Sequence, residues 1–305
     1  VKMKQIKLGN TDLEVSEICL GADGFGSMLP RELAFQVLDR FREGGGNFID
    51  TANIYVRDFA AGYSLSERIL GEYLRSRGKD SLIIATKGAH PNPKTMHTSR
   101  ISRDEISRDI DESLDSLGLE VLDFYWLHRD DPDMPIGEII ELMEEFVRDG
   151  KIRYYGGSNY SAERISEGTR YAAEHNLHGF SAISNMWSPA VQNAGHPLSA
   201  DDTLVCFDDS RLDVFRGSSV AFVPYNSTAK GWFAKRAAGI RNERLDSVFD
   251  NETNLALLSK LETTAQNEEI SVQTALLRHI RKYPVQIVPV TSVSKIEQFD
   301  DLLSV

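Results

Sequence analysis

Short apolar runs alternate with segments of helical periodicity through most of the chain, and this alternation restricts the fold more than any other feature. Alternating strands and helices are typical of a parallel sheet whose faces are covered by helices. Eight such strands, each followed by a helix, predict an α/β fold of the (β/α)8, or TIM, barrel type. We predict the strands at 18–20, 48–50, 82–87, 121–128, 154–158, 180–184, 220–225 and 285–290.

The segments between these strands define the remaining elements. Residues 3–8 and 13–15 alternate around a turn at 9–10 and predict an N-terminal β-hairpin that plugs one end of the barrel. Long loops are expected after strands 6 and 7, at 189–216 and 226–250, and loops of this length are usually functional or mobile. Ser66 is predicted as the N-cap of the second helix. The helices are predicted at 31–43, 66–77, 102–117, 136–149, 162–176, 272–282 and 295–303.

The competing fold is an open, doubly wound sheet, which needs a glycine-rich phosphate turn after its first strand. The segment 21–26 has glycines at 21, 24 and 26, which is the wrong order for the GxGxxG pattern. No internal repeat, low-complexity stretch or linker interrupts the chain, so we expect a single barrel domain over residues 1–305.

Composition narrows the possible partners. The formal charge of −12 over 305 residues argues against nucleic acid and against anionic membranes. Cys19 and Cys206 give no pattern for a disulfide framework or a zinc site, so we expect no metal and a reduced, cytoplasmic protein. No apolar run approaches the ~20 residues of a membrane-spanning helix.

Titratable side chains stand at the ends of three successive strands. Strand 2 ends at Asp50, strand 3 at Lys87 and strand 4 at His128, and Tyr55 follows strand 2 by five residues. Each residue also has a purely structural explanation. Asp50 could cap a loop, Lys87 could be a surface lysine, and Tyr55 and His128 could be two aromatic residues among many. Because the carboxyl ends of barrel strands meet at one face, we expect these four residues, the tetrad, to share one pocket.

The tetrad has the composition of a tuned proton donor. An unperturbed tyrosine has a pKa near ~10, and a neighbouring ammonium such as that of Lys87 lowers it. A buried lysine needs a counter-charge, which Asp50 can supply. A histidine can hydrogen-bond a substrate oxygen and orient it. Together these groups predict protonation of an oxygen that gains negative charge, as in carbonyl reduction by hydride from a cofactor.

With these residues in place, the chain resembles the aldo-keto reductases over nearly its whole length. The resemblance implies that Tyr55 protonates the carbonyl oxygen, that Lys87 paired with Asp50 lowers the pKa of Tyr55, and that His128 orients the carbonyl. The matching segments are FIDTANIY (48–55), SERILGEYL (66–74), IIATKG (83–88), DFYWLHRDDPDMP (123–135), GKIRYYGGSNY (150–160) and VPYNSTAKGWF (223–233).

The resemblance also implies a nicotinamide cofactor, with NADP(H) favoured and NAD(H) possible. Ser158 and Asn159 fall where the family binds the nicotinamide carboxamide. Trp187 falls where an aromatic ring, more often tyrosine, stacks on the nicotinamide, and Ser184 stands where the family usually has glutamine. The segment after strand 8 lacks the family's usual arginine. The cofactor-binding residues expected in this way are Ala22, Asp50, Ser158, Asn159, Ser184, Trp187, Tyr225, Asn226, Ser227, Thr228, Ala229, Ser292, Ser294, Lys295 and Gln298.

Two other functions remain open at this level. Some proteins of this fold are cofactor-sensing accessory subunits of membrane channels, and a Schiff-base aldolase would use Lys87 as its nucleophile. The expected partner is a small carbonyl or alcohol, and the sequence leaves the oligomeric state open. Residues that either line an apolar substrate pocket or pack in the core are Phe25, Met28, Trp187 and Trp232, with Arg129 as an additional charge.

Overall fold

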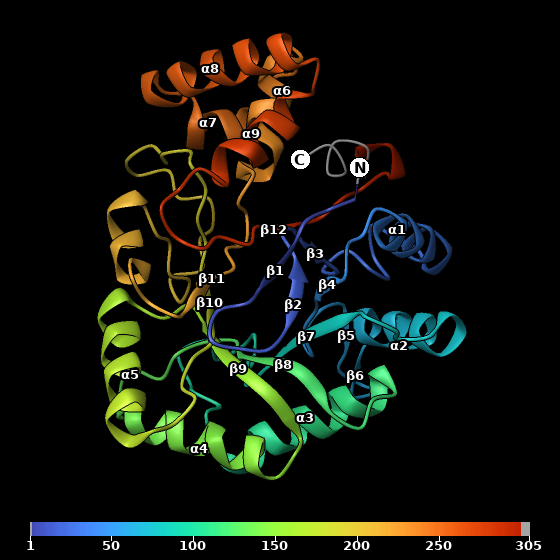
Figure 1. Cartoon of the computed structure of the whole chain (residues 1–305), viewed down its shortest axis with the longest axis vertical. Coiled ribbons are helices and arrows are strands. Elements are labelled where there is room, and N and C mark those ends of the chain that lie inside the picture. The colour runs from blue at the N-terminus through green and yellow to red at the C-terminus, as the bar shows by residue number, and fades with distance from the viewer. Residues whose placement is uncertain (1, 300–305) are drawn as a thin grey trace.

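The computed structural model describes residues 2–299, and within this range eight parallel strands surround a common centre (Figure 1). The ring closes where the amide of Phe222 donates to the carbonyl of Gln286 at 2.9 Å and the amide of Val288 donates to the carbonyl of Phe222 at 2.8 Å. The predicted (β/α)8 barrel is therefore confirmed. In spatial order the strands are β11 (Ala221–Phe222), β10 (Ala182–Ser184), β9 (Ile152–Ser158), β8 (Leu122–Leu127), β7 (Ile83–Gly88), β4 (Phe48–Asp50), β3 (Cys19–Gly21) and β12 (Val290–Thr291).

The predicted hairpin forms from β1 (Gln5–Lys7) and β2 (Glu14–Ser16), which pair antiparallel. Its side chains Leu8, Leu13 and Val15 are fully buried, in one cluster with Phe48 and Phe124 from the inward faces of the strands. The hairpin therefore closes one end of the barrel with apolar side chains, as expected. This leaves the opposite mouth, at the carboxyl ends of the strands, for a functional site.

Five helices cover the outer faces of the strands along the right, bottom and lower left of Figure 1. In α1 the buried positions Ala34, Val37, Leu38 and Phe41 follow the spacing of one helix face. This face packs on the strands because it removes apolar surface from water. The five helices are α1 (Arg31–Glu43), α2 (Leu65–Arg77), α3 (Arg103–Leu117), α4 (Ile136–Arg148) and α5 (Ala162–His175).

The N-cap of α2 differs from the prediction. Ser64, at the end of the short hairpin strand β6 (Tyr63–Ser64) that pairs with β5 (Arg57–Asp58), accepts a hydrogen bond from the amide of Glu67. The predicted cap, Ser66, lies inside the helix, where its hydroxyl donates to the carbonyl of Ala22. A serine three positions before the capped amide provides the usual geometry, and Ser64 has it.

The connection after strand 6 is the expected long loop, whereas the connection after strand 7 differs most from expectation. Between β10 and β11 the described chain contains only a 3-10 helix, η1 (Asp209–Phe215). The predicted loop at 226–250 is largely helical, and a further helix follows it. The helices of this part of the chain are η2 (Ala229–Gly231), α6 (Trp232–Ala237), α7 (Glu243–Phe249), α8 (Glu252–Glu268) and α9 (Val272–Ile280). Figure 1 shows α6 to α9 gathered at the top of the view, beside the barrel.

The last strand and helix also lie differently. The chain at 286–290 makes the expected pairing with its neighbours, although only Val290–Thr291 forms regular strand. The helix predicted at 295–303 appears as the 3-10 turn η3 (Ile296–Gln298), and its later residues lie outside the described range. Among the described residues, none of the helices combines the length and the hydropathy needed to cross a membrane.

Candidate active site

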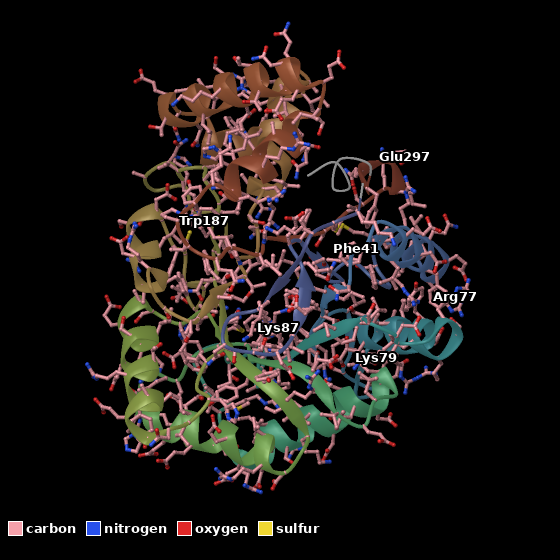
Figure 2. The ribbon with its side chains drawn as sticks, in the orientation of Figure 1. Phe41, Arg77, Lys79, Lys87, Trp187 and Glu297 are labelled. Carbon is pink, nitrogen blue, oxygen red and sulfur yellow. The ribbon has the colours of Figure 1, made fainter. Side chains whose placement is uncertain are left out.

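A cavity of about 770 Å³ opens at the carboxyl ends of the barrel strands. All four residues of the tetrad line it, because each stands at or just beyond the end of β4, β7 or β8. Asp50, Lys87 and His128 are 4%, 3% and 7% exposed, so these polar groups are almost completely removed from water. Figure 2 places Lys87 near the middle of the barrel.

The ammonium of Lys87 joins the tetrad together. It forms a short ion pair with the Asp50 carboxylate, donates to the carbonyl of Thr51 at 2.9 Å and lies 3.3 Å from the hydroxyl of Tyr55. Burial opposes its charge, but Asp50 and Tyr55 more than compensate and hold the pKa of Lys87 above its usual value. Lys87 therefore stays protonated at neutral pH.

Tyr55 and Asp50 respond to the same surroundings. Burial raises the pKa of the Tyr55 hydroxyl, and the ammonium of Lys87 offsets only part of this rise. The expected effect of Lys87 thus has the predicted sign, but burial outweighs it in the protein alone. Burial likewise raises the pKa of Asp50 while Lys87 opposes the rise. Tyr55 is consequently a protonated phenol over the neutral range.

His128 packs edge-on against Tyr55, with 5.9 Å between the ring centroids. Burial, with added repulsion from His90, Lys87 and Arg129, holds the pKa of His128 well below its usual value, so its imidazole is neutral. His90, which the sequence prediction missed, lies with its ring centroid 4.7 Å from that of His128. Its place two residues after β7 was the available signal.

Three side chains at the N-cap and in the first turn of α2 hold the segments that carry the tetrad. Ser64 donates to the carbonyl of Tyr55 at 2.7 Å, and Ser66 contacts the hydroxyl of Thr51 at 2.8 Å. The fully buried Glu67 accepts from Thr86, the residue before Lys87, at 2.5 Å. The helix start thus connects the chain around Asp50, Tyr55 and Lys87.

Asn159 lies at the centre of a second network. Its amide donates to the carbonyl of His128 and to the hydroxyl of Ser158, and it accepts from the hydroxyl of Tyr225 and the amide of Val205. These bonds occupy all four hydrogen-bonding positions of the side chain. Asn159 lines the cavity as predicted, but it would have to exchange one of these bonds to bind a carboxamide.

Most of the predicted cofactor residues after strands 7 and 8 also line the cavity. The structure adds Lys230 and Lys235, which sequence reasoning missed, to the expected Lys295. The three lysines give this wall a positive character that the net charge of the chain does not reveal. The predicted residues on the wall are Asp50, Ser158, Asn159, Tyr225, Asn226, Thr228, Ser292, Ser294, Lys295 and Gln298.

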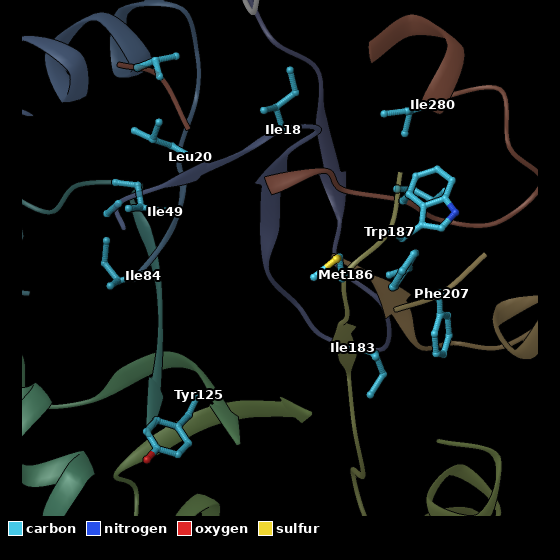
Figure 3. Packing of buried hydrophobic residues seen from close by; sticks show 14 of the residues in the cluster. Ile18, Leu20, Ile49, Ile84, Tyr125, Ile183, Met186, Trp187, Phe207 and Ile280 are labelled. Atoms are coloured by element: carbon cyan, nitrogen blue, oxygen red, sulfur yellow. The ribbon is translucent and has the colours of Figure 1, made fainter. Parts of the chain in front are cut away.

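Five predicted cofactor residues lie outside the cavity wall, namely Ala22, Ser184, Trp187, Ser227 and Ala229. Trp187 differs most clearly from the expected position beside the cofactor. Its ring is 1% exposed, packs edge-on against Phe222 and Tyr283, and its indole N–H donates to Asp209 at 3.1 Å. Figure 2 shows it away from Lys87, and Figure 3 shows it among buried apolar residues near Met186 and Ile280. Tyr225 is the aromatic residue that faces the cavity from this side.

The comparisons with known proteins agree with this architecture. The model of the aldo/keto reductase family matches residues 17–305, so the chain belongs to this family. A relative named norsolorinic acid reductase B from Aspergillus parasiticus is 27% identical over 93% of this chain and 75% of its own length. An uncharacterized oxidoreductase, YrpG of Bacillus subtilis, is 28% identical over 99% and 90%. An aryl-alcohol dehydrogenase [NADP(+)] of Phanerodontia chrysosporium is 26% identical over 93% and 77%.

Proposed function

We propose that this oxidoreductase uses NADP(H) or NAD(H) to interconvert an aldehyde or ketone and its alcohol, with Tyr55 as the general acid. One observation carries the proposal: in one cavity, the Lys87 ammonium contacts both the Asp50 carboxylate and the Tyr55 hydroxyl. This arrangement places a proton donor where an oxygen could receive a proton as its carbon is reduced.

The bound nicotinamide would supply or accept the hydride. The chain's own residues would do the rest. The neutral His128 would hydrogen-bond the carbonyl oxygen and hold it within reach of Tyr55. Tyr55 would donate its proton to that oxygen, and Lys87 would stabilise the resulting phenolate. Asp50 would keep Lys87 charged and in position.

The wall formed by η2 and α6 supports a dinucleotide in this cavity. Ala229, Lys230 and Gly231 have φ angles of 51°, 52° and 74°, so three consecutive residues adopt the left-handed conformation. Such a conformation costs of order 1–3 kcal/mol for a residue with a side chain and is often kept at ligand-binding loops. The amides of Ala229 and Gly231 donate to the carbonyls of Asn226 and Thr228, so a phosphate here would be bound by side chains. The lysines Lys230, Lys235 and Lys295 on this wall favour a phosphate-rich cofactor, and NADP(H) over NAD(H).

A Schiff-base aldolase fits the same residues less well. A lysine nucleophile must lose its proton, whereas Asp50 and Tyr55 raise the pKa of Lys87 above its usual value. Borohydride should therefore trap no substrate on Lys87.

Tyr55→Phe tests the proposal. The variant should lose at least ~100-fold in kcat for aldehyde reduction, because it keeps the ring but lacks the proton that general-acid catalysis needs. Its affinity for NADPH, measured by fluorescence titration, should change little. Tyr154→Phe, outside the cavity, is the matched control. Retained turnover in Tyr55→Phe would refute the assignment.

A further inference from the structure

We propose, building on the function above, that Arg129 and Asp201 form a specificity pair for substrates that carry a neutral oxygen beside the reacting carbonyl. Such substrates include α-hydroxy aldehydes and 1,2-dicarbonyl compounds. The argument rests on where Arg129 lies, on which of its N–H groups are used, and on the charge that Asp201 brings to it.

Arg129 is a buried cation on the cavity wall. It follows His128 directly, is 7% exposed and lines the same cavity as the tetrad. Its Nη1 donates to the carbonyl of His128 at 2.9 Å, which holds the guanidinium beside the histidine proposed to bind the carbonyl oxygen. A buried guanidinium at this point is costly unless its charge and its donors find partners.

The long connection after β10 provides those partners. Nε of Arg129 donates to the hydroxyl of Thr203 at 2.9 Å, and Nη2 donates to Asp201 at 3.0 Å. With the bond to His128, the described residues account for three of the five N–H groups that a guanidinium carries. One N–H on each terminal nitrogen remains for a ligand in the cavity.

The charge of the pair decides what that ligand is. Asp201 is itself held by Thr203, which donates to it from both its amide and its hydroxyl. Burial acts to raise the pKa of Asp201, but the bonds from Thr203 and Arg129 hold it below its usual value, so the carboxylate stays charged. Asp201 neutralises Arg129 from behind the cavity wall. An anionic substituent would therefore gain little net attraction from Arg129, whereas a hydroxyl or carbonyl oxygen can accept its remaining N–H groups.

The same loop carries an apolar residue into the cavity. Leu204 lines it between Thr203, which bonds Arg129, and Val205, whose amide bonds Asn159 at 3.1 Å. The pair thus has a second consequence, since it fixes the position of Leu204. A test must separate recognition of substrate from anchoring of this loop.

Three aldehydes serve as matched probes: methylglyoxal with a neighbouring carbonyl, propanal with none, and glyoxylate with a carboxylate. We expect Arg129→Met to lower the ratio of kcat/KM for methylglyoxal to that for propanal by at least about tenfold, the size of one hydrogen bond from a charged donor. Arg129→Lys should lower the ratio less. We expect Asp201→Asn, which frees the guanidinium from its counter-charge, to raise the glyoxylate to propanal ratio about tenfold.

The control is Arg164→Met. Arg164 forms a similar ion pair with Asp130 but does not line the cavity, so its loss should leave both ratios within twofold. If Arg129 only anchors the loop, Arg129→Met and Asp201→Asn will change the methylglyoxal to propanal ratio and the glyoxylate to propanal ratio in the same direction. The inference then fails while the proposed function stands. If Arg129→Met does not fold, Arg129→Lys and Asp201→Asn decide between the same outcomes. If the wild type reduces no carbonyl with either cofactor, the proposed function fails and the inference with it.

Discussion

At the scale of single residues, the proton on Tyr55 depends on a balance between burial and one ammonium. Burial raises the pKa of Tyr55 and Lys87 lowers it, and burial is the larger effect. Reduction needs the protonated phenol, and the raised pKa keeps it protonated beyond ~10. We therefore expect kcat/KM for reduction to stay level from pH 6 to ~10 and to fall only above it, while alcohol oxidation rises with pH.

Lys87→Met tests this balance. Removing the ammonium should raise the pKa of Tyr55 further and move the alkaline limb of reduction to higher pH. It should also lower kcat by roughly 10²–10⁴-fold, because the phenolate loses its stabilising charge. The measurement is the pH dependence of kcat/KM for carbonyl reduction and for alcohol oxidation. A fall in reduction by the wild type near pH 7 would contradict the account.

The location of the tetrad was predictable because strand ends of a barrel share one face, so polar residues at 50, 87 and 128 had to converge. The position of Trp187 was not predictable, because Trp187 follows β10 in an irregular connection, where no strand periodicity fixes the direction of its ring. Lys230 and Lys235 were missed for a similar reason, since the segment that carries them was expected to be a loop.

At the scale of elements, α2 carries a carboxyl group whose ionisation is coupled to folding. Burial raises the pKa of Glu67 to about 7, from a usual value near 4.5, although Thr86 and other partners lower it. At pH values between these two pKa values, the folded state therefore binds a proton that the unfolded state has already released. Its contribution to stability is full below pH ~4.5 and is lost as the pH rises towards 7.

Glu67→Gln should remove this loss. The amide can still accept from Thr86 and carries no charge, so the variant should gain on the order of 3 kcal/mol over the wild type at pH 8 and almost nothing at pH 4.5. Urea unfolding at a series of pH values measures the difference. Glu72→Gln, on the exposed side of the same helix, should leave the pH dependence unchanged. A constant difference across the series would be evidence against a buried, titrating Glu67.

Among the elements, those with a wide apolar face or a clear strand run were predictable. α8 was missed because it buries only a narrow stripe, at Asn254, Leu258, Leu261 and Ala265, and its other positions are mostly exposed. The two-residue strand β11 was overestimated, since its apolar run continues beyond the pairing that the barrel requires.

At the scale of the whole molecule, a chain with a net charge of −12 has a cavity wall with three lysines. The net negative charge of the protein should therefore repel a phosphate-rich cofactor, while the positive charge of these three lysines should attract it. We expect NADPH at about 100 times its Kd to stabilise the protein by about 2.7 kcal/mol. NADH at the same concentration should stabilise it less.

If Lys235 faces the phosphate that NADPH has and NADH lacks, Lys235→Met should reduce the stabilisation by NADPH more than the stabilisation by NADH. Lys260→Met, in the exposed part of α8, should change neither. Thermal unfolding with each cofactor, at low and high salt, provides the readout. Equal stabilisation by both cofactors, unaffected by salt, would speak against a phosphate-binding wall.

The barrel as a whole was predictable from eight strand runs, but the position of its closure was not. Closure depends on backbone pairing of residues 286–290 with β11 and β3, and no pattern of side chains in the sequence predicts this pairing.

That closure has a consequence for biosynthesis. Cys19 donates its amide to the carbonyl of Pro289, so one edge of β3 stays without its partner until residues 289–290 have left the ribosome. During translation the nascent polypeptide therefore exposes an unpaired β edge and an open interior. Chaperone dependence should accordingly be greatest just before β12 is synthesised.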